Sequence, residues 1–143
     1  MTEVLDIIEH LYGLSPLWKE GVSFERVGTG AMIYRTAWPA VPEVWNVESS
    51  GIPFLHLRGK HIKPTTCAAR ILVPFASQSV IDIQSVSVLR DYLARKELQR
   101  TDLQVRGELL SSVPLVAFRG VGIGTARRLK GGKFESLFPA ARF

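Results

Sequence analysis

The chain has 143 residues and a formal net charge of +5, with 46% hydrophobic and 22% charged residues. These proportions are those of one ordinary globular domain and exclude an intrinsically disordered chain. No stretch approaches the roughly 18 consecutive apolar residues that a transmembrane helix needs, so we expect no membrane contact.

The N-terminal stretch MTEVLDIIEHLY has three acidic and no basic residues, so it lacks the positively charged start of a secretory signal. The single cysteine, Cys67, can form neither an internal disulfide nor a cysteine-rich zinc site. We therefore expect a cytoplasmic protein. No HExxH, GxSxG or Walker pattern is present, and we expect neither a metal nor a cofactor.

Apolar residues recur at helical spacing over residues 4–12, which predicts an amphipathic N-terminal helix. Short runs rich in β-branched and aromatic residues follow and predict strands; they cover residues 22–27, 31–38, 44–48, 52–57, 68–75 and 103–109. The first two strands form a hairpin around Gly28-Thr29-Gly30. His56 alternates with Leu55 and Leu57, which places it on the solvent face of its strand. Ser85 caps a second helix, expected over residues 86–98.

The predicted fold class is α+β: an N-terminal helix, a small mostly antiparallel sheet, a second helix and a C-terminal appendage. We expect a core of residues 1–111 with a basic segment, residues 112–143, packed on it as one compact unit. The charge supports this division. The first 112 residues hold 12 basic and 12 acidic residues, so the whole excess of positive charge lies in the last 31 residues.

The basic segment contains the most informative pattern in the chain. Pro114 suits the first turn of a short helix that Ser112 caps, and a second helix is expected to begin at Thr125. A glycine hairpin would join the two. The positions that carry this pattern are Leu115, Phe118, Gly120, Val121, Gly122, Thr125, Ala126 and Leu129. Residues 112–137 thus resemble the helix-hairpin-helix motif, a DNA-binding unit that does not read sequence, and residues 134–137 are similar to the short helix that often follows it.

This resemblance implies a phosphate site. Glycines let the ligand approach the backbone closely, and the N–H groups that begin the second helix form an anion site. The nucleic-acid-binding residues expected are Arg119, Gly120, Val121, Gly122, Gly124, Thr125, Arg127, Arg128, Lys130 and Lys133. Contacts of this kind hold DNA or RNA by its backbone without reading bases.

Two other resemblances use the same glycines. Gly122-Ile123-Gly124 with Gly131-Gly132 is similar to the C-terminal glycine-rich loop of the CRISPR repeat-RNA endonucleases and their ferredoxin-like relatives. In that interpretation the protein is an RNA-binding protein or RNA endonuclease, and His61, in the basic stretch Lys60-His61-Ile62-Lys63, is the candidate general base. The stretch from Arg119 to Gly124 is also similar to the pyrophosphate loop of acetyltransferases, but only 19 residues follow it, fewer than that fold needs.

A further interpretation makes the chain a structural or assembly subunit of a larger complex. Trp38, beside Pro39 and Pro42, would then mark a contact with a protein partner. The sequence leaves three functions open: binding of the nucleic-acid backbone, RNA processing and protein assembly.

Overall fold

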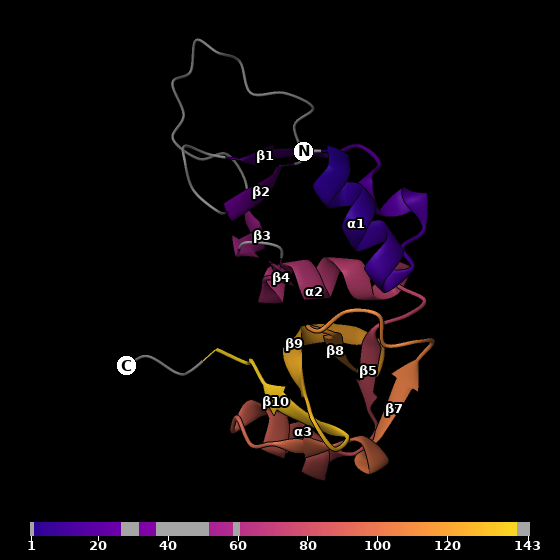
Figure 1. The fold of residues 1–143 in the computed structure, drawn as a ribbon, viewed down its shortest axis with the longest axis vertical. Coiled ribbons are helices and arrows are strands. Elements are labelled where there is room, and N and C mark those ends of the chain that lie inside the picture. The colour runs from indigo at the N-terminus through magenta and orange to yellow at the C-terminus, as the bar shows by residue number, and fades with distance from the viewer. Residues whose placement is uncertain (1, 27–31, 37–51, 59–60, 140–143) are drawn as a thin grey trace.

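A computed structural model describes residues 2–26, 32–36, 52–58 and 61–139. Within these residues the chain forms three α-helices and two β-sheets, so the predicted α+β class is confirmed. Figure 1 shows the two sheets in different halves of the molecule, with one short helix, α2, between them. The predicted boundary between residues 111 and 112 falls within the C-terminal half, whose sheet has strands on both sides of it.

The N-terminal half confirms the predicted first helix and the pairing of the first two strands, whereas the turn predicted at Gly28-Thr29-Gly30 lies outside the described residues. It contains α1 (Thr2–Tyr12), a 3₁₀ turn (Pro16–Lys19), β1 (Ser23–Arg26), β2 (Met32–Thr36), β3 (Ile52–Arg58) and β4 (His61–Pro64). The four strands pair antiparallel in chain order, and the strand expected over residues 52–57 is β3. The predicted strand over residues 44–48 and the proposed contact at Trp38 lie outside the described residues.

Helix α2 (Thr66–Leu72), continued by a 3₁₀ turn (Val73–Phe75), replaces the strand predicted over residues 68–75. The Thr65 side chain caps it by accepting a hydrogen bond from the Ala68 N–H at 3.1 Å. Ala68 and Ala69 are fully buried. The prediction is wrong because the periodicity of a short apolar run cannot distinguish a buried helix from a buried strand.

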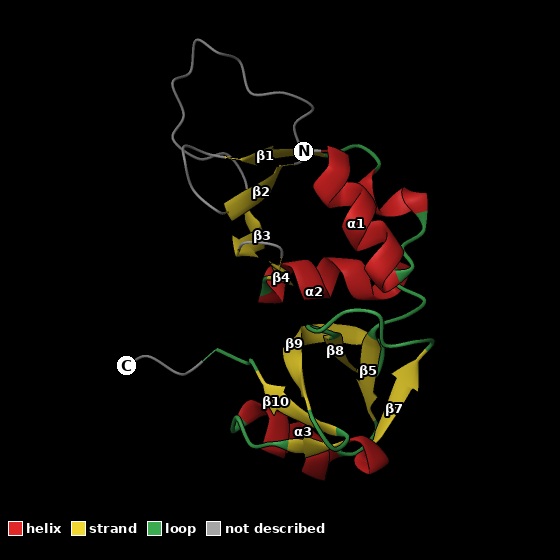
Figure 2. Ribbon diagram, in the orientation of Figure 1, coloured by secondary structure: helices red, strands yellow, loops and turns green. Residues whose placement is uncertain are grey.

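The C-terminal half is a six-stranded mixed sheet that curls into a half-barrel, with α3 packed against it (Figure 2). Its elements are β5 (Val80–Ile83), α3 (Val86–Leu93), β6 (Leu98–Gln99), β7 (Leu103–Arg106), β8 (Leu115–Phe118), β9 (Val121–Leu129) and β10 (Lys133–Ser136), in the spatial order β6-β10-β9-β8-β5-β7. Strands β5 and β8 are parallel, whereas the other pairs are antiparallel. Ser85 caps α3 as predicted, but the helix ends at Leu93 and not at residue 98.

The predicted helix-hairpin-helix is wrong, because residues 112–137 contain strands β8, β9 and β10 and no helix. A tight turn does occur here: Arg119 and Gly120, with φ of 51° and 81°, join β8 to β9. Positive φ at both turn positions matches the twist of a two-residue β-hairpin. The segment is not an appendage either, since β8 and β9 are inner strands of the sheet. Val116, Val121 and Ile123 are β-branched, and residues of this type favour strands over helices.

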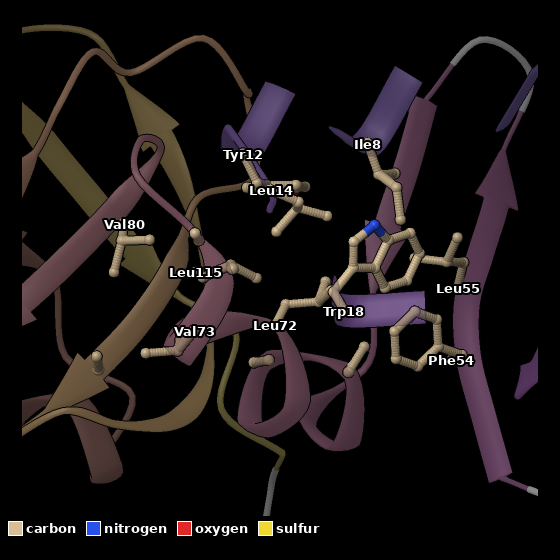
Figure 3. Packing of buried hydrophobic residues seen from close by; sticks show 14 of the residues in the cluster. Ile8, Tyr12, Leu14, Trp18, Phe54, Leu55, Leu72, Val73, Val80 and Leu115 are labelled. Carbon is tan, nitrogen blue, oxygen red and sulfur yellow. The ribbon is translucent and has the colours of Figure 1, made fainter. Parts of the chain in front are cut away.

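Two hydrophobic clusters lie on the two faces of the curled sheet. The first joins α1, α2 and the N-terminal sheet, and Trp18 stacks there on Phe54 with ring centroids 6.0 Å apart (Figure 3). Leu115 of β8 belongs to this cluster, whereas Val116 belongs to the second cluster, inside the half-barrel. Because neighbouring residues of a strand point to opposite faces, β8 ties the two halves into one packed structure.

Candidate nucleic-acid interface

The glycines of the C-terminal motif are explained by close packing. A Cβ atom at Gly122 would overlap the carbonyl oxygen of Ala69 in α2, and one at Gly124 would overlap the Tyr92 hydroxyl from α3. Both glycines are buried. The expected phosphate site requires the N-terminus of a helix after the Arg119-Gly120 turn. Strand β9 begins there instead, and residues 112–139 contain no helix.

The predicted binding residues separate into three groups. Gly122, Gly124 and Thr125 are buried in β9. Arg119, Gly120 and Val121 are exposed at the β8–β9 turn, where the Arg119 guanidinium lies 5.0 Å from the centre of the Phe118 ring. The remaining four are exposed: Arg127 and Arg128 at the other end of β9, Lys130 in the turn that follows it and Lys133 at the start of β10. This last group holds four of the five predicted basic residues.

The structure brings part of this last group together with basic residues from the N-terminal half. A hollow of about 430 Å³, which we call the cationic cleft, is lined by His61, Lys63, Ser112, Arg127, Arg128 and Leu137, with Val113. His61 and Lys63 belong to β4, at the edge of its sheet, where Ile62 packs toward the core and both basic side chains are exposed. No Asp or Glu is among the lining residues.

The basic residues at the cleft and at the start of β10 differ in whether a carboxylate pairs with them. Arg127 pairs with Glu135, which lies directly opposite it on β10, and the Lys133 ammonium lies 3.4 Å from the Glu97 carboxylate. The Arg128 guanidinium instead donates a hydrogen bond to the Leu109 carbonyl at 2.8 Å. Neither Arg128 nor Lys63 forms an ion pair with any residue in the described part of the chain. Both therefore present a full positive charge to the cleft.

Two further hollows adjoin the cationic cleft. One, of about 220 Å³, lies at the β9–β10 turn and is lined by Arg100, Arg128, Gly131, Gly132 and Lys133 among others. Arg128 lines both this turn hollow and the cationic cleft, and we call the cations of the two hollows the basic track. The other, of about 260 Å³, shares Lys63 and Leu137 with the cleft and is otherwise lined by uncharged groups and His56. We call it the threonine pocket because Thr65, Thr66 and Thr125 line it.

Residues that sequence reasoning missed contribute to both ends of this track. Lys63 stands out in the sequence only as part of a basic stretch, and Arg100 does not stand out at all. The cross-strand pairing of His56 with Lys63 confirms that His56 lies on the outer face of β3, although it is half-buried. Local sequence carries no signal for the meeting of β4 with β9, since more than sixty positions separate Lys63 from Arg127.

The clearest pKa shifts belong to two buried tyrosines that do not themselves line the cationic cleft. Burial raises the pKa of Tyr12 and Tyr92 well above the usual tyrosine range.

Among the described residues, no three His, Cys, Asp or Glu side chains cluster closely enough to hold a metal ion. No helix in that part of the chain has the length and apolarity needed to cross a membrane.

A scan against models of known protein families and a comparison with curated proteins each find no match for this chain.

Proposed function

We propose that this protein binds nucleic acid by its phosphate backbone along the basic track of the cationic cleft and the turn hollow. The observation that supports this proposal is the meeting of cations from distant parts of the chain. Lys63 comes from the N-terminal sheet, where His61 lies on the same strand, whereas Arg127 and Arg128 come from β9. A solvated basic tail would not place cations from two sheets around one hollow.

The chemistry of the track suits a chain of phosphates. Arginine guanidinium groups bind phosphate oxygens through two parallel hydrogen bonds, and lysine adds a compact positive charge. Each phosphate that the protein neutralises releases counterions from the nucleic acid, which favours binding at low salt. Because Arg128 lines both hollows, one strand can contact the cleft and the turn hollow at consecutive phosphates.

The first experiment is a fluorescence-anisotropy titration of the intact protein with labelled single-stranded and double-stranded DNA and RNA at several salt concentrations. The test variant carries Arg127→Ala and Arg128→Ala. The matched control carries Arg90→Ala and Lys96→Ala, which removes the same charge from exposed positions at or just beyond α3 that line none of the three hollows.

We expect the test variant to bind more weakly than the control. The slope of the logarithm of affinity against the logarithm of salt concentration should fall by about 0.7 to 0.9 for each phosphate that the protein no longer neutralises. Equal affinity and equal slope in the two variants would contradict the proposal. Absence of salt-dependent binding to all four nucleic acids, together with a stable oligomer at high salt, would favour the assembly-subunit interpretation.

RNA cleavage is a second candidate, because His61 lines the same hollow as three cations. A histidine there would accept the proton of a ribose 2′-hydroxyl as that oxygen bonds to phosphorus. The bond from phosphorus to the 5′-oxygen would break, and the leaving oxygen would take a proton from water. The expected result is metal-independent cleavage with a cyclic phosphate product, abolished by His61→Ala. Intact RNA after prolonged incubation would exclude this candidate and leave the binding proposal unaffected.

A further inference from the structure

We infer that the threonine pocket receives an unstacked nucleobase of a single strand whose phosphates lie in the cationic cleft. This inference rests on the proposed function and adds to it, because a backbone contact alone gives no preference for bases. The first observation is position: the pocket adjoins the cleft, and Lys63 and Leu137 line both hollows. A strand held by its phosphates beside Lys63 would therefore have a base within reach of the pocket.

The second observation is an unpartnered hydroxyl. Four polar residues are buried in the described part of the chain: Ser79, Ser111, Thr125 and Ser136. All three serine hydroxyls form hydrogen bonds. The Thr125 hydroxyl forms none with any described residue, although Thr125 is only 3% exposed. Buried polar groups are nearly always paired, so an exception of this kind calls for a ligand or an ordered water.

The direction of the Thr125 side chain follows from β9. Gly124 faces the Tyr92 hydroxyl inside the half-barrel, and neighbouring residues of a strand point to opposite faces. Thr125 therefore faces the side of α2, where it lines the threonine pocket. By contrast, the hydroxyl of Thr65 is occupied, because it donates to the Pro53 carbonyl at 2.8 Å while capping α2. Thr125 thus offers an unused hydrogen-bonding group to a ligand.

The remaining walls suit a base better than a phosphate. Leu137, Pro64 and Pro139 supply apolar surface, His56 supplies a flat ring, and Lys63 is the pocket's only Lys or Arg. A flat aromatic base can contact such walls, and its polar edge can exchange hydrogen bonds with a hydroxyl. The volume of about 260 Å³ is large enough for one base, and an unpaired base has its polar edge free to bond the hydroxyl.

The experiment compares two probes with the same number of phosphates. One is a labelled single strand of uridylate about ten nucleotides long, and the other is the same ribose-phosphate chain without bases. The wild-type protein is expected to bind the strand with bases about tenfold more tightly. Thr125→Val should reduce this preference about fivefold, as the loss of one hydrogen bond would. It should leave the affinity for the abasic chain unchanged, and Thr125→Ser should restore the preference.

Thermal unfolding of Thr125→Val separates a binding role from a structural one. Because the hydroxyl has no partner among the described residues, its removal should leave the melting temperature unchanged or raise it. The inference is overturned if the abasic chain binds as tightly as the strand with bases, a result that leaves the proposed function standing. It is also overturned if Thr125→Val lowers the melting temperature without changing the base preference. If neither probe binds, the proposed function itself fails for single strands.

Discussion

The two ends of strand β9 differ in what their side chains do. At the beginning of the strand, Gly122 and Gly124 allow α2 and Tyr92 to approach the backbone, and both glycines are buried. At the end, Arg127 and Arg128 are exposed and line the cationic cleft. Packing therefore explains the glycines, and the proposed binding depends on the charges. The helix-hairpin-helix interpretation assigned the glycines and the arginines to one phosphate site, whereas the structure separates a packing role from a charged surface.

The largest expected effect on stability is at the beginning of β9, where the glycines pack against other elements. Gly122→Ala would press a methyl group against the backbone oxygen of Ala69, which has no side-chain freedom to move away. We expect a loss of about 3 kcal/mol or more in the free energy of unfolding, at or beyond the upper end of ordinary overpacking costs. Urea denaturation measures it. Gly131→Ala is the control, because a Cβ there meets no atom within 4 Å, although its φ of +78° adds some strain. Similar losses at the two positions would refute close packing at Gly122.

Alkaline pH should destabilise the protein through its buried tyrosines. The pKa values of Tyr12 and Tyr92 are raised in the folded state by burial, so the unfolded chain releases their protons first. Their contribution to stability is complete below pH 10 and falls as the pH rises, by up to about 1.4 kcal/mol per pH unit for each tyrosine. Urea midpoints between pH 9 and pH 11 should fall less in a variant with Tyr12→Phe and Tyr92→Phe. Parallel pH profiles in the two proteins would show that neither hydroxyl is buried as described.

A double-mutant cycle tests whether the Tyr92 hydroxyl is what limits the space at Gly124. A Cβ there meets the Tyr92 hydroxyl first and the rest of the ring only at 3.3 Å or more. Gly124→Ala alone should cost about 1 to 3 kcal/mol. In a protein that already carries Tyr92→Phe, the same change should cost clearly less, because the overlapping oxygen is gone. Additive effects in chemical denaturation would indicate that another atom limits the space.

The smallest effect on stability is expected at the charged end. Arg127 pairs with Glu135 at the surface, and exposed ion pairs contribute at most about 1 kcal/mol. The double change Arg127→Ala and Arg128→Ala should therefore alter the unfolding free energy by about 1 kcal/mol or less while weakening nucleic-acid binding. A stability loss as large as that of Gly122→Ala would mean that the two ends of β9 do not differ in this way.

Local signals predicted the elements that local interactions determine. Helical periodicity located α1, runs rich in β-branched and aromatic residues located β1 to β3, and the Ser85 cap located the start of α3. The same methods failed where burial or distant pairing decides the structure. The apolar run of α2 is buried on both sides, and β8 pairs in parallel with β5 across more than thirty residues. Glycine, threonine and basic residues around a turn fit a helical hairpin and a β-hairpin equally well.

The sequence identified the C-terminal cations of the candidate site and His61, but not Lys63 or Arg100 as binding residues. Arg127, Arg128 and Lys133 were identified from charge, and the structure places all three along the basic track. Arg119 carries the same charge but lies at the opposite end of β9. The meeting of Lys63 and His61 with Arg127 and Arg128 required the tertiary structure, because the packing of α2 between the two halves is what brings β4 near β9.

The hydrogen bond from the Tyr12 hydroxyl to the Val113 carbonyl, 2.6 Å long, joins residues 101 positions apart. During synthesis α1 leaves the ribosome long before β8 exists, and Leu115 of β8 belongs to the same cluster as α1. Its apolar face, including Ile8 and Tyr12, must wait for that strand before its burial is complete. Contacts of such long range slow folding and prolong the exposure of apolar surface. A nascent chain halted before residue 113 is therefore expected to bind chaperones and to resist proteolysis poorly.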